Sequence, residues 1–204
     1  YFNPDRMGFG KLRVWNDDVI KPGKGFPMHP HADMEIITYL RKGEISHEDN
    51  LGNKGVTVAG DVQVMSAGTG IVHSEYNRGE VDTELFQIWI ETDRAGHEPR
   101  WDAKKFPDAG RGAVLEPLAS GRKGHDDALM IHQDAALFGA TLEVGDSVTH
   151  TLEPGRRAYV VAVGGAITIN GTDAPARAGV AVSDETDIVI VAKEPGEVVL
   201  LDLP

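Results

Sequence analysis

The chain has 204 residues, of which 41% are hydrophobic, 24 are glycine and 11 are proline, a composition typical of a globular protein with many turns. Its 20 lysine and arginine residues are outnumbered by 32 aspartate and glutamate residues, and the net charge of −12 argues against direct binding of DNA or RNA. Because the chain has no cysteine, it offers only imidazole and carboxylate groups as strong metal ligands, and disulfides and thiolate nucleophiles are excluded.

Short β-rich runs separated by turn residues recur along the chain. They occupy residues 11–15, 35–40, 55–58, 62–66 and 86–91, and then 158–163, 166–170, 188–192 and 198–203. Residues suited to tight turns, such as Gly43, Gly60 and Asn170-Gly171, lie between them. This punctuation predicts an all-β fold built from antiparallel barrels or sandwiches.

A region rich in proline and glycine, residues 94–127, separates the two β-rich halves. The sequence predicts short helical pieces in two places, at residues 102–106 and 134–138. We therefore predict two domains, over residues 1–106 and 107–204, with the linker at the start of the second.

Two short motifs in the first half place potential metal ligands at alternate positions. They are His29-Pro30-His31 and His73-Ser74-Glu75. Composition alone predicts roughly 0.3 His-x-His pairs in a chain of this length, so either motif by itself is weak evidence. Residues i and i+2 of a strand point to the same face, about 7 Å apart, so two facing strands would direct three imidazoles and one carboxylate to one point. The alternative is that these histidines are hydrogen-bonded strand residues without a ligand.

The spacing of the glycine, histidine and other polar residues around these motifs resembles that of the two cupin motifs. The first is matched by Gly23, His29, His31, Glu35 and Gly43. The second is matched by Gly60, Ser66-Ala67-Gly68, His73 and Asn77, with Ser66 in the usual place of proline. Residues 14–18, 25–35, 47–54 and 65–77 further resemble the pirin family, especially its bacterial pirin-like quercetin 2,3-dioxygenases.

The resemblance implies a bicupin of two tandem antiparallel, jelly-roll-like β-barrels. Residues 1–106 would carry one metal, held by His29, His31, His73 and Glu75, and residues 107–204 would form the linker and a degenerate barrel. The implied activity opens the central ring of a flavonol such as quercetin with O2 and releases carbon monoxide. The resemblance favours Fe(II), although this ligand set also suits Cu, Ni, Co, Mn or Zn.

The roles of three further groups are left open by the sequence. Glu75 could also act as a base, but only if its carboxylate leaves the cation, which otherwise keeps it ionised. Glu35 has the same parity as the two histidines before it, and it is a candidate either for orienting a ligand from behind or for a hydrogen-bonded strand residue. His47 either reaches toward the same pocket or has a structural role in its turn-rich loop.

The second half serves as an internal control for the proposed metal site. Superposing Gly164 on Gly43 places His150 opposite His29, but Leu152 opposite His31 and Arg156 opposite Glu35. No histidine follows position 150. The second half is therefore predicted to be a degenerate repeat without a metal site.

The remaining motifs have plainer interpretations. His97, His125 and His132 are expected to be exposed in or beside the polar junction. Gly68-Thr69-Gly70 lacks the residues of a nucleotide-binding loop, so no nucleotide site is predicted. Four apolar residues could line a pocket for a flat aromatic ligand, but barrel core is the commoner fate of such side chains: Phe26, Met28, Met65 and Trp89.

The sequence shows no apolar run that could span a membrane and no secretory leader, so we expect a soluble cytoplasmic protein without membrane contact. The chain begins at Tyr1 without an initiator methionine, which is compatible with further residues before it. Two alternatives to a dioxygenase share every motif. One is a pirin-like metal or redox sensor that regulates a protein partner, and the other is an isomerase or another cupin enzyme that acts on a small molecule.

Overall fold

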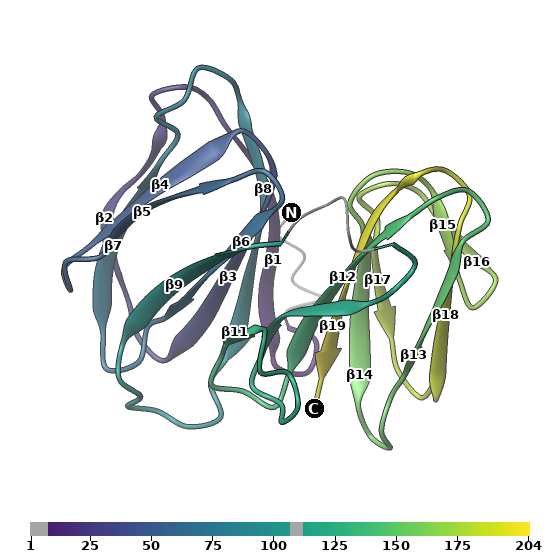
Figure 1. Ribbon diagram of the computed structural model, residues 1–204. Coiled ribbons are helices and arrows are strands. Elements are labelled where there is room, and N and C mark those ends of the chain that lie inside the picture. The colour runs from purple at the N-terminus through teal and green to yellow at the C-terminus, as the bar shows by residue number, and fades with distance from the viewer. Residues whose placement is uncertain (1–7, 107–111) are drawn as a thin grey trace. The chain divides into compact units, whose positions relative to one another are not determined.

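The computed structural model describes residues 8–106 and 112–204, which form an all-β protein (Figure 1). The described residues contain no helix, and neighbouring strands pair in antiparallel register. The strands that build the N-terminal part are β1 (Leu12–Ile20), β2 (Gly25–His31), β3 (Met34–Lys42), β4 (Glu44–Asp49), β5 (Lys54–Val58), β6 (Asp61–Ser66), β7 (Ile71–Tyr76), β8 (Thr83–Glu91), β9 (Arg100–Lys105) and the short β11 (Leu129–Met130).

The C-terminal part is built from shorter strands, several of only three or four residues. These are β10 (Glu116–Ser120), β12 (Ala136–Leu142), β13 (Ser147–Thr151), β14 (Arg157–Ala162), β15 (Ile167–Ile169), β16 (Thr172–Ala174), β17 (Gly179–Val182), β18 (Asp187–Ala192) and β19 (Gly196–Leu203). The all-β architecture predicted from the spacing of turn residues is therefore confirmed.

The chain divides into two compact units. The first contains the described residues up to Phe106 together with Leu129–Gln133, and the second contains the other described residues. The predicted boundary assigns residues 129–133 to the second domain, but two hydrogen bonds attach them to the first. The backbone N–H of Asp93 donates to the carbonyl of His132 at 2.8 Å, and the Gln133 amide donates to the carbonyl of Glu91 at 2.7 Å.

The first unit consists of two sheets whose inner faces share one core. One sheet has the strand order β1-β8-β3-β6-β9 and the other has the order β2-β7-β4-β5. Ile36, Met65 and Ile71 are buried together, with Trp89 and Trp101 packed against them. This arrangement agrees with the alternation of inward and outward side chains in a small β-barrel.

The pairing of β2 with β7 brings the two histidine motifs together. His29 lies opposite His73 in the antiparallel register, after an irregularity between Phe26 and His29. The strands approach closely at Gly25, where a Cβ atom would lie 2.1 Å from the carbonyl oxygen of Glu75. Glycine is therefore required at this position, and it allows the histidine-bearing strand to lie against β7.

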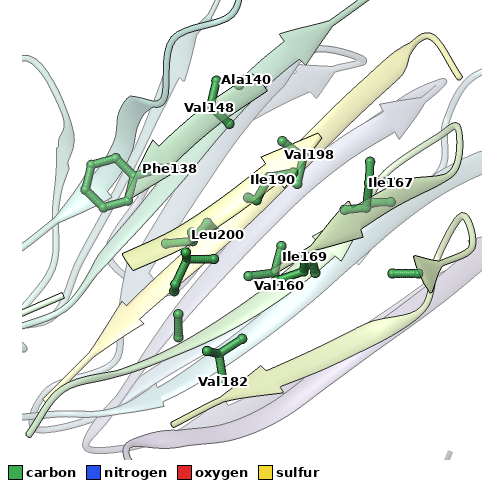
Figure 2. Close-up of a cluster of buried hydrophobic side chains, with 14 of the residues drawn as sticks. Phe138, Ala140, Val148, Val160, Ile167, Ile169, Val182, Ile190, Val198 and Leu200 are labelled. Atoms are coloured by element: carbon green, nitrogen blue, oxygen red, sulfur yellow. The ribbon is translucent and has the colours of Figure 1, made fainter. Parts of the chain in front are cut away.

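The second unit has its own apolar core between two sheets. Their strand orders are β10-β12-β19-β14-β17 and β13-β18-β15-β16. Val160, Ile190 and Leu200 lie in the cluster of aliphatic side chains that fills the space between them (Figure 2). These residues are completely buried, as expected for strands with alternating apolar positions.

The two predicted helical pieces are wrong. Residues 100–105 form β9, in which Trp101 pairs with Met65, and residues 136–142 form β12. Lys104 and Lys105 favour helix as isolated residues, but the edge of β6 offers hydrogen-bonding partners that outweigh this weak local preference.

Candidate metal centre

Three imidazoles converge inside the first unit. His29 and His31 come from β2 and His73 comes from β7, and one ligand nitrogen from each lies within 4.8 Å of the others. The ring centroids of His29 and His73 are 4.4 Å apart, and those of His31 and His73 are 5.1 Å apart. The structure thus brings together the three histidines singled out by their spacing.

The hydrogen bonds around His29 indicate which of its nitrogens is free to bind a cation. Its Nδ1 lies 2.7 Å from the carbonyl oxygen of Pro27, which can only accept, so Nδ1 carries the proton in the neutral ring. The Nε2 atom then presents its lone pair to Nε2 of His73, 3.1 Å away. Two such nitrogens are satisfied together only by a shared proton or by a cation, so this donor set fits a divalent metal.

The electrostatic surroundings keep two of these rings neutral, the state in which imidazole binds metal. Burial, reinforced by the nearby His29, lowers the pKa of His31 to about 4. Burial, together with the neighbouring imidazoles, lowers the pKa of His73 to about 3. Neither ring competes for protons at pH 7.

Glu75 lies two residues after His73 on the same face of β7 and is almost completely buried. It forms a second potential ligand group with His47 and His73, so His73 belongs to both groups. The amides of Gln63 and Gln87 donate to its two oxygens at 2.7 and 2.8 Å. Burial raises the pKa of Glu75 to about 7, against the effect of these two hydrogen bonds.

His47 lies beside the imidazole cluster, on the inner face of β4. Its Nδ1 is 3.4 Å from Nδ1 of His73, and its Nε2 is 3.0 Å from a carboxylate oxygen of Asp49. Its ring stacks on Trp101 at a centroid distance of 4.8 Å. Burial lowers the pKa of His47, although the Asp49 carboxylate acts in the opposite direction. The structure therefore places the His47 ring against His73 and also bonds it to Asp49 at the end of its own strand.

Glu35 does not lie where strand parity places it. β2 ends at His31, and the chain turns through Asp33, which has a positive φ of 48°, before β3 begins at Met34. Glu35 therefore follows a new parity and points away from Ile36, which packs into the barrel core. Its partners are Ser66, which donates to it at 2.7 Å, and His132, whose Nδ1 is 3.4 Å from its other oxygen.

A group of ionisable side chains surrounds Glu35 on this face of β3. The rings of His97 and His132 stack with centroids 3.8 Å apart, and Nε2 of His97 lies 2.6 Å from the Asp93 carboxylate. Burial raises the pKa of Glu35 to about 7, despite the Ser66 hydrogen bond and the nearby His97 and Arg100. Burial also lowers the pKa of His132.

Replacing Glu35 by glutamine should remove a pH-dependent loss of stability. Between pH 4.5 and about 7, the native protein binds more protons at Glu35 than the unfolded chain does, so its free energy of unfolding falls as the pH rises. E35Q imitates the protonated carboxyl at every pH. We expect E35Q to match the parent at pH 4.5 and to be about 3 kcal/mol more stable at pH 8.

Urea unfolding of both proteins at pH 4.5, 6, 7 and 8 measures this difference. The titration of His132 contributes a slope of opposite sign, but it is present in both proteins and largely cancels in the comparison. Parallel stability profiles for the parent and E35Q would show that folding does not raise the pKa of Glu35.

Several residues of the site belong to neither of the two histidine motifs. Gln63 and Gln87 hold Glu75, Asp49 holds His47, and Trp101 stacks on the His47 ring. The sequence feature that could have identified the glutamines is a polar residue inside an otherwise apolar strand, as in Val62-Gln63-Val64. A buried amide at such a position needs a partner, which identifies it as part of a polar network.

The apolar residues considered for a ligand pocket divide into two sets. Met65 is buried in the barrel core, and Trp89 packs partly against it and edge-on to His31 at a centroid distance of 5.0 Å. Phe26 and Met28 have 38% and 54% of their surface exposed, so the expectation of core is wrong for them. Their exposure beside His29 leaves apolar surface at the edge of the imidazole cluster.

The other histidines lie outside this cluster. His97 is only 7% exposed, which contradicts its predicted exposure, and it bonds to Asp93. His125 lies 2.7 Å from the hydroxyl of Ser120. In the second unit, His150 lies 2.8 Å from the buried carboxylate of Asp202. That carboxylate also accepts hydrogen bonds from Arg122 and Arg156.

Comparison with known proteins identifies the family. The model of the family described as pirin matches residues 1–90, and that of the quercetinase C-terminal cupin domain matches residues 118–203. A pirin-like protein from Caulobacter vibrioides is 52% identical over 202 residues, covering 99% of this chain and 87% of the relative. The chain belongs to the pirin family. The predicted family and its two cupin domains are therefore confirmed.

Two further relatives of this pirin have names that bear on function. Quercetin 2,3-dioxygenase from Escherichia coli is 44% identical over 206 residues, covering 100% of the chain and 87% of the relative. The crystal structure of the bacterial pirin YhhW from Escherichia coli, in complex with nickel(II), matches with a TM-score of 0.92 at 42% identity. The alignment covers 100% of this chain and 87% of that structure. Among the described residues of this pirin, no helix is long and apolar enough to cross a membrane.

Proposed function

We propose that this pirin is a metal-dependent dioxygenase that opens the central ring of a flavonol such as quercetin with O2 and releases carbon monoxide. The observation that carries the proposal is the pair of Nε2 atoms of His29 and His73, 3.1 Å apart, in a half-open imidazole cluster. A relative with 44% identity bears the name quercetin 2,3-dioxygenase. The family and the donor set therefore point to the same chemistry.

His29, His31, His73 and Glu75 would hold one divalent ion in this proposal. A bound ion would act as a Lewis acid toward the flavonol oxygen and bring the flavonol and O2 together. Three imidazoles and a carboxylate suit Fe(II), which the family favours, and also the nickel(II) found in the relative. His29 and His31 are half-exposed whereas His73 and Glu75 are buried, so the ion would face solvent on the β2 side.

The residues beside the cluster suit a flat aromatic substrate. Phe26 and Met28 expose apolar surface next to His29, and Trp89 presents its ring to His31. Glu75 is the proposed acceptor for the proton of the flavonol hydroxyl group, a role that requires its carboxylate to leave the ion. The overall reaction needs no reductant, because a flavonol and O2 together contain the same atoms and electrons as the ring-opened ester and carbon monoxide together.

Anaerobic loading with Fe(II), followed by addition of quercetin and O2, tests the proposal. We expect one carbon monoxide for each quercetin consumed, measured by gas chromatography and by loss of the flavonol absorbance. The same assay with Ni, Cu, Co, Mn and Zn identifies the ion that supports the fastest turnover. Metal-loaded protein that leaves quercetin intact would reject this function.

The regulatory alternative predicts a different result in the same preparation. An Fe(II)-loaded protein that does not turn over quercetin but changes its affinity for a protein partner on oxidation to Fe(III) would support a redox sensor. Pull-down from matched lysates with the two oxidation states separates this outcome from a simple failure of catalysis.

A further inference from the structure

Behind His73 lies a buried hydrogen-bonded chain that is not part of the proposed ligand set. Nε2 of His47 is 3.0 Å from Asp49 Oδ2, and Nδ1 of His47 is 3.4 Å from Nδ1 of His73. The side chains of His47 and Asp49 are both completely buried. The ring of Trp101 lies parallel to His47, at an interplanar angle of 10°, and limits its rotation. The geometry of this chain is therefore well defined.

The other contacts of Asp49 show that it acts only as an acceptor. The backbone N–H groups of Leu51 and Asn53 donate to Oδ1 at 2.9 and 3.0 Å, and the Asn53 amide donates to Oδ2 at 2.9 Å. An ionised carboxylate has no proton to donate. The proton between Asp49 and His47 therefore belongs to Nε2 of the imidazole.

Once this proton is placed, the hydrogen-bonding rules limit the positions of the remaining protons. A neutral His47 with its proton on Nε2 has a lone pair on Nδ1, which faces Nδ1 of His73. His73 donates to this lone pair when its single proton is on Nδ1, and its Nε2 is then free to share a cation with the lone pair on Nε2 of His29. These two Nε2 atoms are 3.1 Å apart, so the chain ends at the proposed metal position.

Asn50 attaches the loop that follows β4 to the strand that carries His73. The backbone N–H of Asn50 donates to the carbonyl of Val72 at 3.0 Å, and Val72 N–H donates to the Asn50 side chain at 2.9 Å. Val72 immediately precedes His73. The backbone beside the ligand is thereby held by the loop that Asp49 organises.

We propose that Asp49 and His47 are positioning residues that hold His73 in the tautomer with its lone pair on Nε2, and so prepare the site for a divalent cation. The inference rests on the proposed metal centre. It makes His47 a partner of a ligand rather than a ligand, although His47 also belongs to a potential donor group with His73 and Glu75. Hydrogen bonds of this kind behind a metal ligand set its orientation, and their loss typically weakens metal binding roughly 10- to 100-fold.

Asp49→Asn tests whether the hydrogen bond from His47 Nε2 to residue 49 sets the tautomer of His73. In D49N the side-chain oxygen can still accept from the loop amides, but the NH2 group donates to His47 Nε2 and reverses both tautomers. We expect Ni(II) affinity, measured by competition with a chelating dye, to fall 10- to 100-fold. Asn53→Ala is the matched control, because it removes a donor to the same carboxylate oxygen and leaves the acceptor in place. We expect N53A to bind Ni(II) within threefold of the parent.

The tautomers can be read without any metal, by long-range 1H–15N correlation spectra of protein labelled with 15N-histidine. We expect His73 to carry its proton on Nδ1 in the parent and on Nε2 in D49N. If the parent binds no Ni(II) but shows this exchange of tautomers, the proposed metal centre fails and the positioning chain stands. If the parent binds Ni(II) and D49N changes neither the affinity nor the tautomer, the positioning chain is overturned.

A second pair of variants gives the answer even if D49N does not fold. His47→Asn and His47→Leu remove the ring and its stacking on Trp101 equally, and the two side chains have nearly the same size. Only asparagine offers an oxygen that can accept the His73 Nδ1 proton. We expect H47N to keep Ni(II) affinity within threefold and H47L to lose 10- to 100-fold, so equal affinities would contradict the proposal.

Discussion

Replacement of His73 by alanine should abolish metal binding and, with it, quercetin turnover. His73 belongs to both potential donor groups, and its ring lies between those of His29 and His47, at centroid distances of 4.4 and 5.2 Å. Removing it deletes one of three imidazoles, and His29 loses the partner of its free nitrogen. The loss of affinity should exceed the 10- to 100-fold typical of residues behind a ligand.

Thermal unfolding with and without Ni(II) measures this effect independently of catalysis. A ligand present at about 100 times its dissociation constant stabilises the native state by about 2.7 kcal/mol, so the parent should melt at a higher temperature with metal. We expect H73A to show no such shift. The melting temperature of metal-free H73A is compared with that of the metal-free parent, so that loss of packing at this buried ring is separated from loss of metal binding.

His125→Ala is the matched control for this prediction. His125 lies in the second unit and bonds to Ser120, far from the donor groups in sequence and outside both of them. We expect H125A to retain the metal-dependent shift and full turnover. A metal-dependent shift of equal size in H73A would place the metal elsewhere in the chain.

The part of the site that could be predicted from sequence is the part governed by local geometry. His29 and His31, and likewise His73 and Glu75, share a face because residues at i and i+2 of a strand always do. This rule holds only while the strand continues. It failed for Glu35 because a turn at Asp33 separates β2 from β3, and no strand rule predicts on which side the next strand begins.

The residues that were missed depend on pairing between distant strands. Gln63 and Gln87 come from β6 and β8, yet their amides meet at Glu75 of β7. Trp101 reaches His47 only because β9 adds to the edge of β6, although its sequence favours helix locally. Such contacts are set by the order of strands in the sheets, which a single sequence without a family resemblance does not reveal.

Glu75→Gln should abolish turnover while some metal remains bound. The substitution keeps the size of the side chain but removes its negative charge, so the ligand set becomes weaker and the proposed acceptor for the flavonol proton is lost. With three imidazoles in place, we expect residual Ni(II) binding. The measurements are carbon monoxide release under Fe(II) and Ni(II) affinity by dye competition.

The surroundings of Glu75 explain why an amide cannot replace the carboxylate. Thr57 donates to the Gln63 oxygen at 2.8 Å, and the Trp89 indole donates to the Gln87 oxygen at 3.2 Å. Both glutamine amides are thereby oriented with their NH2 groups toward Glu75. A glutamine at this position would direct its own NH2 group at one of them, leaving two buried donors without an acceptor. This costs roughly 1–3 kcal/mol and opposes the gain from removing a buried charge, because burial raises the pKa of Glu75 to about 7. At pH 8 we therefore expect E75Q to gain less stability than E35Q does.

Glu84→Gln makes the same chemical change on the same kind of strand and serves as the control. Its carboxylate pairs with Arg41 and Lys42 at 3.4 and 3.6 Å, with no contact to the donor groups among the described residues. We expect E84Q to turn over quercetin at the parental rate. If E75Q were as active as E84Q when loaded with Fe(II), a catalytic role for the carboxylate would be rejected, and the three imidazoles would suffice for the reaction.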